Sequence, residues 1–150
     1  MRVLVQRVKE ASVSISGDPV GSIGAGLLLL VGLGQGDGVS ELEWMARKIA
    51  GLRIFSDDAD QMNLSVQDVD GQILAVSQFT LYGDCKKGRR PSFVTAMDPV
   101  DASELFDKFV EKLKSEGIVE VETGSFGQHM EVQLVNDGPV TLWLEKESGS

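Results

Sequence analysis

The hydrophobic positions in the first part of the chain predict β-structure. Residues 2–8 and 11–16 are short runs rich in β-branched residues, and the polar pair Lys9-Glu10 stands between them. This pattern predicts two paired strands that form a hairpin. After turn-forming residues at 17–19, the apolar run Leu27 to Val31 is typical of a strand buried on both faces of a sheet. We therefore expect a central strand there.

Two later segments have the spacing of amphipathic helices. A Ser-x-x-Glu pattern at residues 40–43 predicts a capping box, and apolar residues then recur at helical spacing to about Arg53. An Asp-x-x-Glu pattern at residues 101–104 repeats this signal before a second apolar stripe, and Gly117 stands where a left-handed C-cap belongs. The stripe consists of Leu105, Phe106, Phe109, Val110 and Leu113. We expect both helices to pack on the sheet.

The remaining segments predict strands and one long loop. Residues 72–77 predict a strand whose end opens into a glycine- and lysine/arginine-rich loop ending near Ser92. Three more strands are predicted over residues 118–123, 130–135 and 140–145. The segment Asn136-Asp-Gly-Pro139 is typical of a β-turn, so we expect it to separate the last two strands.

Length and composition indicate one globular domain. The chain has 150 residues, of which 42% are hydrophobic and 25% charged, as is typical of a single folded domain. We expect that domain over residues 1–147 and a polar tail over residues 148–150. The 14 Lys and Arg residues against 23 Asp and Glu residues give a net charge of −9, which argues against broad adhesion to nucleic acid, DNA included, or to anionic membranes.

The location of the protein is inferred from what the sequence lacks. The apolar run at residues 27–31 is far shorter than the roughly 20 residues of a membrane span, and the N-terminus has no signal-peptide pattern. A lone cysteine, Cys85, fits a reducing compartment. We therefore expect a cytoplasmic protein without a membrane partner.

Histidine and cysteine are too scarce for most metal chemistry. One residue of each type cannot supply the usual ligands of zinc, so we expect neither a metal nor a cofactor. Cys85 and His129 are candidates for the nucleophile and base of a thiol hydrolase, although no third residue is placed to orient them. This enzyme class is one alternative interpretation.

Two segments are candidate binding elements. Lys86, Lys87, Arg89 and Arg90 lie within five residues of one another. A solvated loop is the simpler interpretation, but the contrast with the acidic background favours phosphate recognition. A non-catalytic RNA-binding module is therefore a further alternative. Ser77-Gln78-Phe79-Thr80 follows a predicted strand, where amide and hydroxyl groups either cap the strand or bind a ligand.

Together with the C-terminal turn, this strand end carries a resemblance to a known family. Ser77-Gln-Phe-Thr-Leu81 and Asn136-Asp-Gly-Pro-Val-Thr141 resemble the paired signatures of the D-aminoacyl-tRNA deacylases, once called D-tyrosyl-tRNA deacylases. Further similar segments, in the same order, are Gln6-Arg-Val8, Ala11-Ser-Val13, Gly21-Ser-Ile-Gly24-Ala-Gly26, Arg53-Ile-Phe-Ser-Asp57, Met62-Asn63 and Arg90-Pro-Ser-Phe93. One departure is Asp60-Gln61, where family members commonly have Gly-Lys.

The resemblance implies a fold and an activity. It implies a homodimer of single-domain α/β subunits, with mainly antiparallel sheets in a barrel-like core and two packed helices. It also implies hydrolysis of the ester that joins a D-amino acid to tRNA. By matching position, Ser77, Gln78, Phe79 and Thr80 line the catalytic pocket. The resemblance further implies that Gly138 and Pro139, joined by a cis bond, enter the pocket of the other subunit and select the chirality of the substrate.

The residues available fit this chemistry. An aminoacyl ester is already activated, so positioned water and backbone oxyanion donors suffice without a triad or a metal. The neighbouring ribose 2′-hydroxyl is able to orient the water, as in the substrate-assisted mechanism associated with the family. With no base identifiable beside Thr80, we expect a binding or orienting role for it. We also expect cleavage of glycyl-tRNA, exclusion of L-amino acids, and tRNA contacts from Lys86, Lys87, Arg89 and Arg90.

Overall fold

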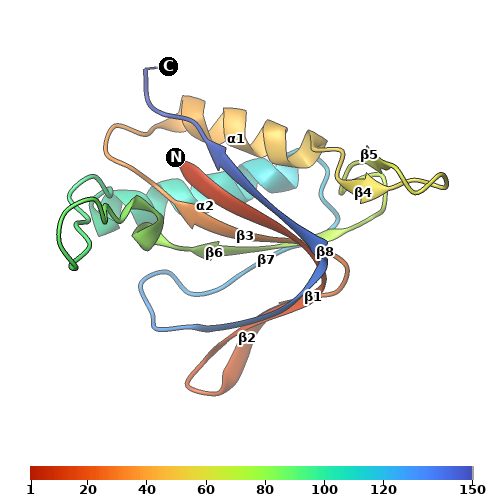
Figure 1. Cartoon of the computed structure of the whole chain (residues 1–150), viewed down its shortest axis with the longest axis horizontal. Helices are drawn as coiled ribbons and strands as arrows, with labels where there is room; N and C mark the ends of the chain where they lie inside the picture. Colours follow the sequence, from red (N-terminus) through yellow and green to blue (C-terminus); the bar gives the residue numbers. More distant parts are fainter. Residues whose placement is uncertain (150) are drawn as a thin grey trace.

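A single long strand, β1 (Arg2–Ile15), organises the sheet of this computed structural model, which describes residues 1–149 (Figure 1). Along one edge β1 pairs first with β3 (Gly26–Gly32) and then with β2 (Asp18–Ile23). Along its other edge it pairs with β8 (Glu131–Glu145) over nearly its whole length. All three pairings are antiparallel.

The predicted hairpin between residues 2–8 and 11–16 is wrong. Lys9 and Glu10 lie inside β1, and the chain reverses at Ser16 and Gly17, which both have a positive φ. Register shifts against β8 on both sides of Val8 show that the strand is bulged there. A bulge exposes polar residues without ending a strand, which is why the break in the hydrophobic pattern resembled a turn.

The other half of the sheet is parallel and contains the predicted central strand. β3 pairs with β6 (Gln72–Ser77), and β6 pairs with β7 (Val121–Thr123). From β3 the sheet continues through β6 to β7, while β2 and β3 pair with successive parts of one edge of β1 and β8 pairs with its other edge. Apart from the half-buried Leu30, every residue of β3 is buried, which confirms the prediction of a strand covered on both faces.

The sheet is strongly curved (Figure 1), and its outer strands β2 and β7 come close together. A Cβ at Gly21 of β2 would lie 2.5 Å from the carbonyl oxygen of Thr123 in β7. Only glycine permits so close an approach of two backbones. The predicted α/β domain with a barrel-like core and two helices is therefore confirmed.

The two helices lie together on one face of the sheet (Figure 1). α1 (Val39–Gly51) begins after Gly38 without a side-chain cap, so the predicted capping box is wrong; Ser40 bonds to the neighbouring Glu41 instead.

α2 (Pro99–Ser115) is capped by Asp98, whose carboxylate accepts a hydrogen bond from the Val100 N–H at 3.2 Å. The cap thus precedes the predicted one by three residues, because Pro99 already fits the first turn. Gly117 has a φ of +91°, as its predicted C-cap role requires.

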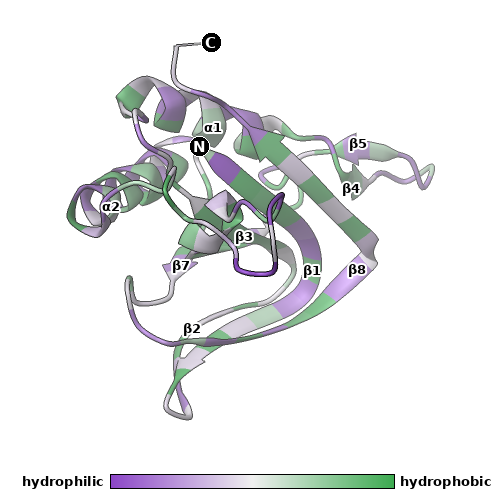
Figure 2. Cartoon of the chain, turned by 60° about the vertical axis from the view of Figure 1, so that its left-hand side comes forward, coloured by the Kyte–Doolittle hydropathy of each residue, from purple (hydrophilic) through white to green (hydrophobic). Residues whose placement is uncertain are grey.

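Apolar side chains form two cores, one on each side of the sheet. The larger core lies between the sheet and the helices and includes Leu27, Leu29 and the fully buried Phe109. The smaller core lies inside the curl and includes Leu28 and Leu74. Figure 2 shows the alternation of hydrophobic and hydrophilic residues along β1 and β8 that this two-sided arrangement produces.

The predicted separation of the last two strands is wrong in the same way as the first hairpin. β8 runs continuously from Glu131 to Glu145, and residues 137–140 form a large bulge between the partners of Gln6 and Val8. The pairing with β1 resumes on both sides of the bulge, so turn-forming residues need not end a strand. The predicted tail over residues 148–150 reaches Ser150, which lies outside the described residues.

A short hairpin outside the main sheet contains the departure from the family pattern. β4 (Phe55–Ser56) pairs with β5 (Met62–Leu64), and Asp60 between them has a φ of +60°. Aspartate tolerates this left-handed conformation, so the turn forms without the glycine. The Gln61 N–H bonds to the Asp57 carboxylate at 3.0 Å and holds the pKa of Asp57 below its usual value.

No helix within residues 1–149 is both long and apolar enough to cross a membrane.

Candidate functional site

The predicted pocket residues lie where β6 leaves the sheet. Ser77 ends β6 opposite Val31 of β3, and the Gln78 N–H donates to the Val31 carbonyl at 2.7 Å. The chain then turns into a short 3₁₀ helix, η1 (Phe79–Tyr82). The first hydrogen bond within this turn is donated by the Leu81 N–H to the Gln78 carbonyl at 3.2 Å. The N–H groups of Phe79 and Thr80 precede that bond, as the unpaired donors at a helix start do.

The side chains of this turn offer polar groups and one exposed ring. Gln78 Nε2 donates a hydrogen bond to Thr80 Oγ1. Because an amide nitrogen does not act as a proton acceptor, this contact orients the Thr80 hydroxyl without activating it as a nucleophile. Phe79 is 57% exposed and meets Phe93 edge to face, with ring centroids 5.2 Å apart. The two rings form an apolar wall beside the polar pair.

The basic loop begins directly after η1. Asp84 and Ser92 close its base through two backbone hydrogen bonds of 2.7 and 2.9 Å. The four predicted tRNA-binding residues are all exposed between them; they are Lys86, Lys87, Arg89 and Arg90. Because Phe93 follows this loop and packs on Phe79, the cations lie next to the strand end.

The second predicted element, Gly138-Pro139, lies exposed in the bulge of β8 and contains a cis peptide bond. Asn136 spans the bulge, because its Oδ1 accepts a hydrogen bond from the Val140 N–H at 2.7 Å and its Nδ2 donates to Thr141 at 2.9 Å. These bonds fix the two ends of the segment on either side of Gly138.

Arg7 holds the same bulge from β1. Its Nε donates to the Asp137 carbonyl at 2.9 Å, and a second guanidinium nitrogen donates to the Ile54 carbonyl at 2.6 Å. The Arg7 side chain is 11% exposed. Neither Arg7 nor Asn136 is among the predicted site residues, and the local pattern gives no signal for Arg7, because it bonds a carbonyl 130 positions away.

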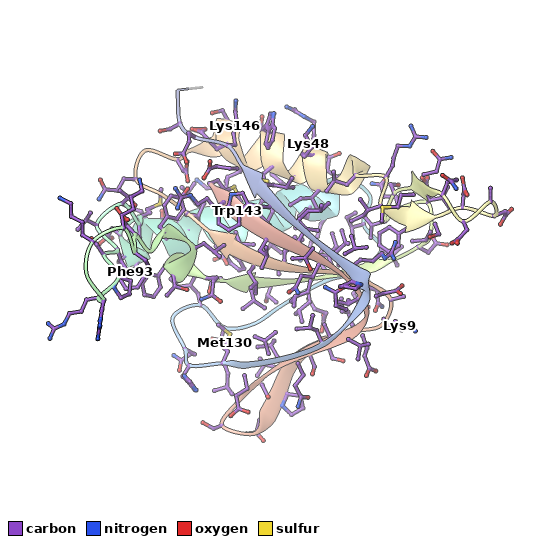
Figure 3. All side chains as sticks on the ribbon, viewed as in Figure 1. Lys9, Lys48, Phe93, Met130, Trp143 and Lys146 are labelled. Carbon is purple, nitrogen blue, oxygen red and sulfur yellow. The ribbon has the colours of Figure 1, made fainter. Side chains whose placement is uncertain are left out.

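One chain does not bring the two elements together. Ser77 lies level with Val3 of β1, whereas the bulge lies between the partners of Gln6 and Val8. Three strand spacings of about 4.8 Å and roughly four residues of about 3.3 Å separate them, or some 15–20 Å. Figure 3 shows the same separation: Phe93, which packs on Phe79 of η1, lies at the left of the view, and Lys9, in the bulged part of β1, lies at the right.

The alternative catalytic groups are not assembled by the structure. Cys85 is exposed at the start of the basic loop, and His129 lies between β7 and β8. No hydrogen bond joins these two side chains in the part of the chain that is described. The same residues contain no cluster of three or more His, Cys, Asp or Glu side chains that suits a metal ion.

Comparisons with known proteins agree with the residue pattern. The sequence model of the family described as D-Tyr-tRNA(Tyr) deacylase matches residues 4–145. The D-aminoacyl-tRNA deacylase of Exiguobacterium sp. is 60% identical over 148 residues, which cover 99% of this chain and 100% of that protein. The protein of the same name from Chloroherpeton thalassium is 61% identical over 145 residues, covering 97% of this chain and 95% of its own.

Solved structures show the same fold. A structure titled c-Myc DNA Unwinding Element Binding Protein superposes with a TM-score of 0.91 at 40% identity, covering 98% of this chain and 99% of its own. A probable eukaryotic D-amino acid tRNA deacylase superposes with a TM-score of 0.82 at 18% identity, covering 95% and 97%. At that identity the likeness concerns the fold alone.

The family match and the curated relatives define a hydrolase that acts on aminoacyl-tRNA. The chain belongs to the D-Tyr-tRNA(Tyr) deacylase family, as the resemblance implied. Its D-aminoacyl-tRNA deacylase activity makes tRNA its binding partner.

Proposed function

We propose that this protein cleaves D-aminoacyl-tRNA in a pocket shared by two copies of the chain and excludes L-amino acids by the backbone of Gly138-Pro139. The observation that carries this proposal is the placement of two exposed elements at opposite ends of one sheet. In a homodimer with twofold symmetry, each element of one subunit meets the other element of its partner, which gives two equal pockets.

The exposed apolar surface supports dimerisation. Trp143 and Phe79 are 48% and 57% exposed. Trp143 pairs with Leu4 of β1, and the neighbouring residues of β8, Leu142 and Leu144, pack toward the helices. Successive side chains of a strand point to opposite faces, so Trp143 lies on the face that the helices leave uncovered. A second copy that covers this surface removes its apolar area from water, which favours association.

For hydrolysis the protein mainly has to position the ester and the attacking water. Water adds to the ester carbonyl, the tetrahedral oxyanion collapses, and the 3′-oxygen of the terminal ribose leaves with a proton, which releases tRNA and a free D-amino acid. The backbone N–H groups of Phe79 and Thr80 are the donors for the oxyanion. Thr80 and Gln78 orient the ester or the water, and the ribose 2′-hydroxyl assists the attack.

Chirality is selected by exclusion in this proposal. The backbone of Gly138 and Pro139 from the second subunit holds the α-amino group and blocks the direction that an L side chain takes. Because exclusion depends on no contact with a particular side chain, many D-amino acids are accepted. Glycine has no side chain to exclude, so glycyl-tRNA is also cleaved.

The first test separates hydrolysis from mere binding and from thiol chemistry. Purified protein incubated with D-tyrosyl-tRNA is expected to release the amino acid, and Cys85→Ala is expected to act at a rate within about twofold of wild type, because no general base is bonded to the thiol. An intact ester indicates an RNA-binding module. An inactive Cys85→Ala variant with an unchanged melting temperature indicates a thiol hydrolase.

Removal of the basic loop charges is expected to weaken binding more than chemistry. We expect the variant with Lys86, Lys87, Arg89 and Arg90 all changed to glutamine to raise KM and leave kcat nearly unchanged. The slope of log KM against log salt should fall by roughly 0.7 to 0.9 for each lost phosphate contact. A control variant, Lys108→Gln with Lys114→Gln on α2, keeps the wild-type slope; an unchanged slope in the quadruple variant contradicts the assignment.

A further inference from the structure

The N-terminal end of β1 reaches the catalytic turn through one side chain, Arg2. One of its terminal nitrogens donates to the Leu81 carbonyl at 2.9 Å, and its Nε donates to Glu145 of β8 at 2.7 Å. Its guanidinium carbon lies 4.3 Å from the centroid of the Tyr82 ring. The side chain is 28% exposed. A single residue thus joins β1, β8 and η1.

The Leu81 carbonyl lies at the end of the turn, where a donor is otherwise lacking. The turn is held internally by the Leu81 N–H on Gln78 and by the Gly83 N–H on the Thr80 carbonyl at 2.9 Å. Carbonyls at the end of such a helix have no following N–H to accept from. The guanidinium of Arg2 fills this role with a charge-assisted hydrogen bond, which is stronger than a neutral one.

The Tyr82 ring depends on packing for its position. A Cβ at Gly34 would lie 2.5 Å from the ring, so the ring rests directly on the backbone of that glycine. The Tyr82 hydroxyl is buried and has no hydrogen-bond partner among residues 1–149. Burial raises the pKa of Tyr82, and the negative charge of Asp37 raises it further, so the phenol stays neutral. The Arg2 guanidinium then stacks on a neutral ring as a cation–π contact.

We propose that Arg2 is a positioning residue for the deacylation reaction. It fixes Leu81 and Tyr82 at the end of η1 and thereby the Phe79 and Thr80 N–H groups at its start, because a single helical turn moves as one unit. This inference rests on the proposed function, which assigns those N–H groups to the oxyanion. Its effect falls on kcat rather than on tRNA binding, because Glu145 pairs with the Arg2 charge.

The test compares two variants, Arg2→Met and the matched control Arg53→Met. Arg2→Met keeps an unbranched apolar side chain in place of the aliphatic part of arginine and removes the guanidinium, and we expect kcat to fall about tenfold, with KM for D-tyrosyl-tRNA within about twofold of wild type. Arg2→Lys retains one charged donor and should recover part of kcat. The control is Arg53→Met, because Arg53 also donates its Nε to a backbone carbonyl, that of Asn63 at 3.0 Å, but in the β4–β5 hairpin. This control should keep the wild-type kcat.

A second measurement is independent of activity. Hydrogen exchange at the Leu81 and Gly83 amides should quicken in Arg2→Met and stay unchanged in Arg53→Met, because these two amides report the hydrogen bonds within η1. Unchanged exchange overturns the positioning role, whatever the activity. Faster exchange with an unchanged kcat also overturns it. If wild-type protein leaves the ester intact, the proposed function fails, and the exchange comparison still decides whether Arg2 holds the turn.

Discussion

Deacylation by the Gly138→Ala variant is expected to fall about 100-fold or more, the loss that a displacement of about 1 Å in a positioned site produces. Gly138 has a φ of +147°, and an added Cβ would lie 2.7 Å from the Val140 backbone nitrogen. The bulge must therefore shift, and with it the surface that faces the substrate. Gly138 is exposed, but the added Cβ would also lie 2.7 Å from Cγ2 of Val140, a buried residue of the larger core, so we expect a lower melting temperature and compare the rates well below it. The rate of D-tyrosyl-tRNA hydrolysis measures the effect.

A second glycine variant controls for backbone strain. Gly17 in the β1–β2 turn has a φ of +84°, and an added Cβ there meets nothing within 4 Å. Gly17→Ala therefore introduces a left-handed alanine without a steric clash, at a cost of about 1 kcal/mol in stability, and should retain wild-type activity. Wild-type activity in Gly138→Ala would show that the bulge does not act on the substrate.

Two inactive variants are expected to restore each other when they share a dimer. Thr80→Trp places a large ring on the exposed turn and blocks the pocket, whereas Gly138→Ala displaces the bulge. In a heterodimer of the two, one pocket combines the intact turn of one chain with the intact bulge of the other. We expect such heterodimers, purified by two different tags, to show about half the wild-type activity per dimer. Activity no greater than that of either variant alone would place each site within one chain.

Much of the fold was predictable because its signals are local. The buried run of β3 predicts a strand, and the apolar stripe of α2 predicts a helix, each from a few neighbouring residues. The two long strands were not predictable as single elements, because Lys9-Glu10 and Asn136 to Pro139 read as turns. Pairing with the neighbouring strand on both sides of each bulge keeps the strand continuous, and such pairing is not visible in local sequence.

The site was predictable in part for the same reason. Ser77 to Thr80 are contiguous, and a strand end followed by polar groups is a local pattern. The contacts that hold the site are not local: Arg7 bonds Asp137 and Arg2 bonds Leu81, across 130 and 79 positions of sequence. Each of these arginines lies in a strand where nothing distinguishes it from a solvent-facing residue. Only the folded sheet brings it to the segment that it holds.

Hydrolysis of matched D-, L- and glycyl-tRNA by the same preparation is the most direct test of selection by exclusion. Each of several tRNAs is charged with the D or L form of its amino acid or with glycine, and the ester remaining is followed over time. We expect rapid loss of several different D-amino acids, measurable loss of glycine, and L-aminoacyl esters that decay no faster than without protein. Rapid cleavage of L-aminoacyl-tRNA, or activity toward one D side chain alone, would contradict exclusion by the Gly138-Pro139 backbone.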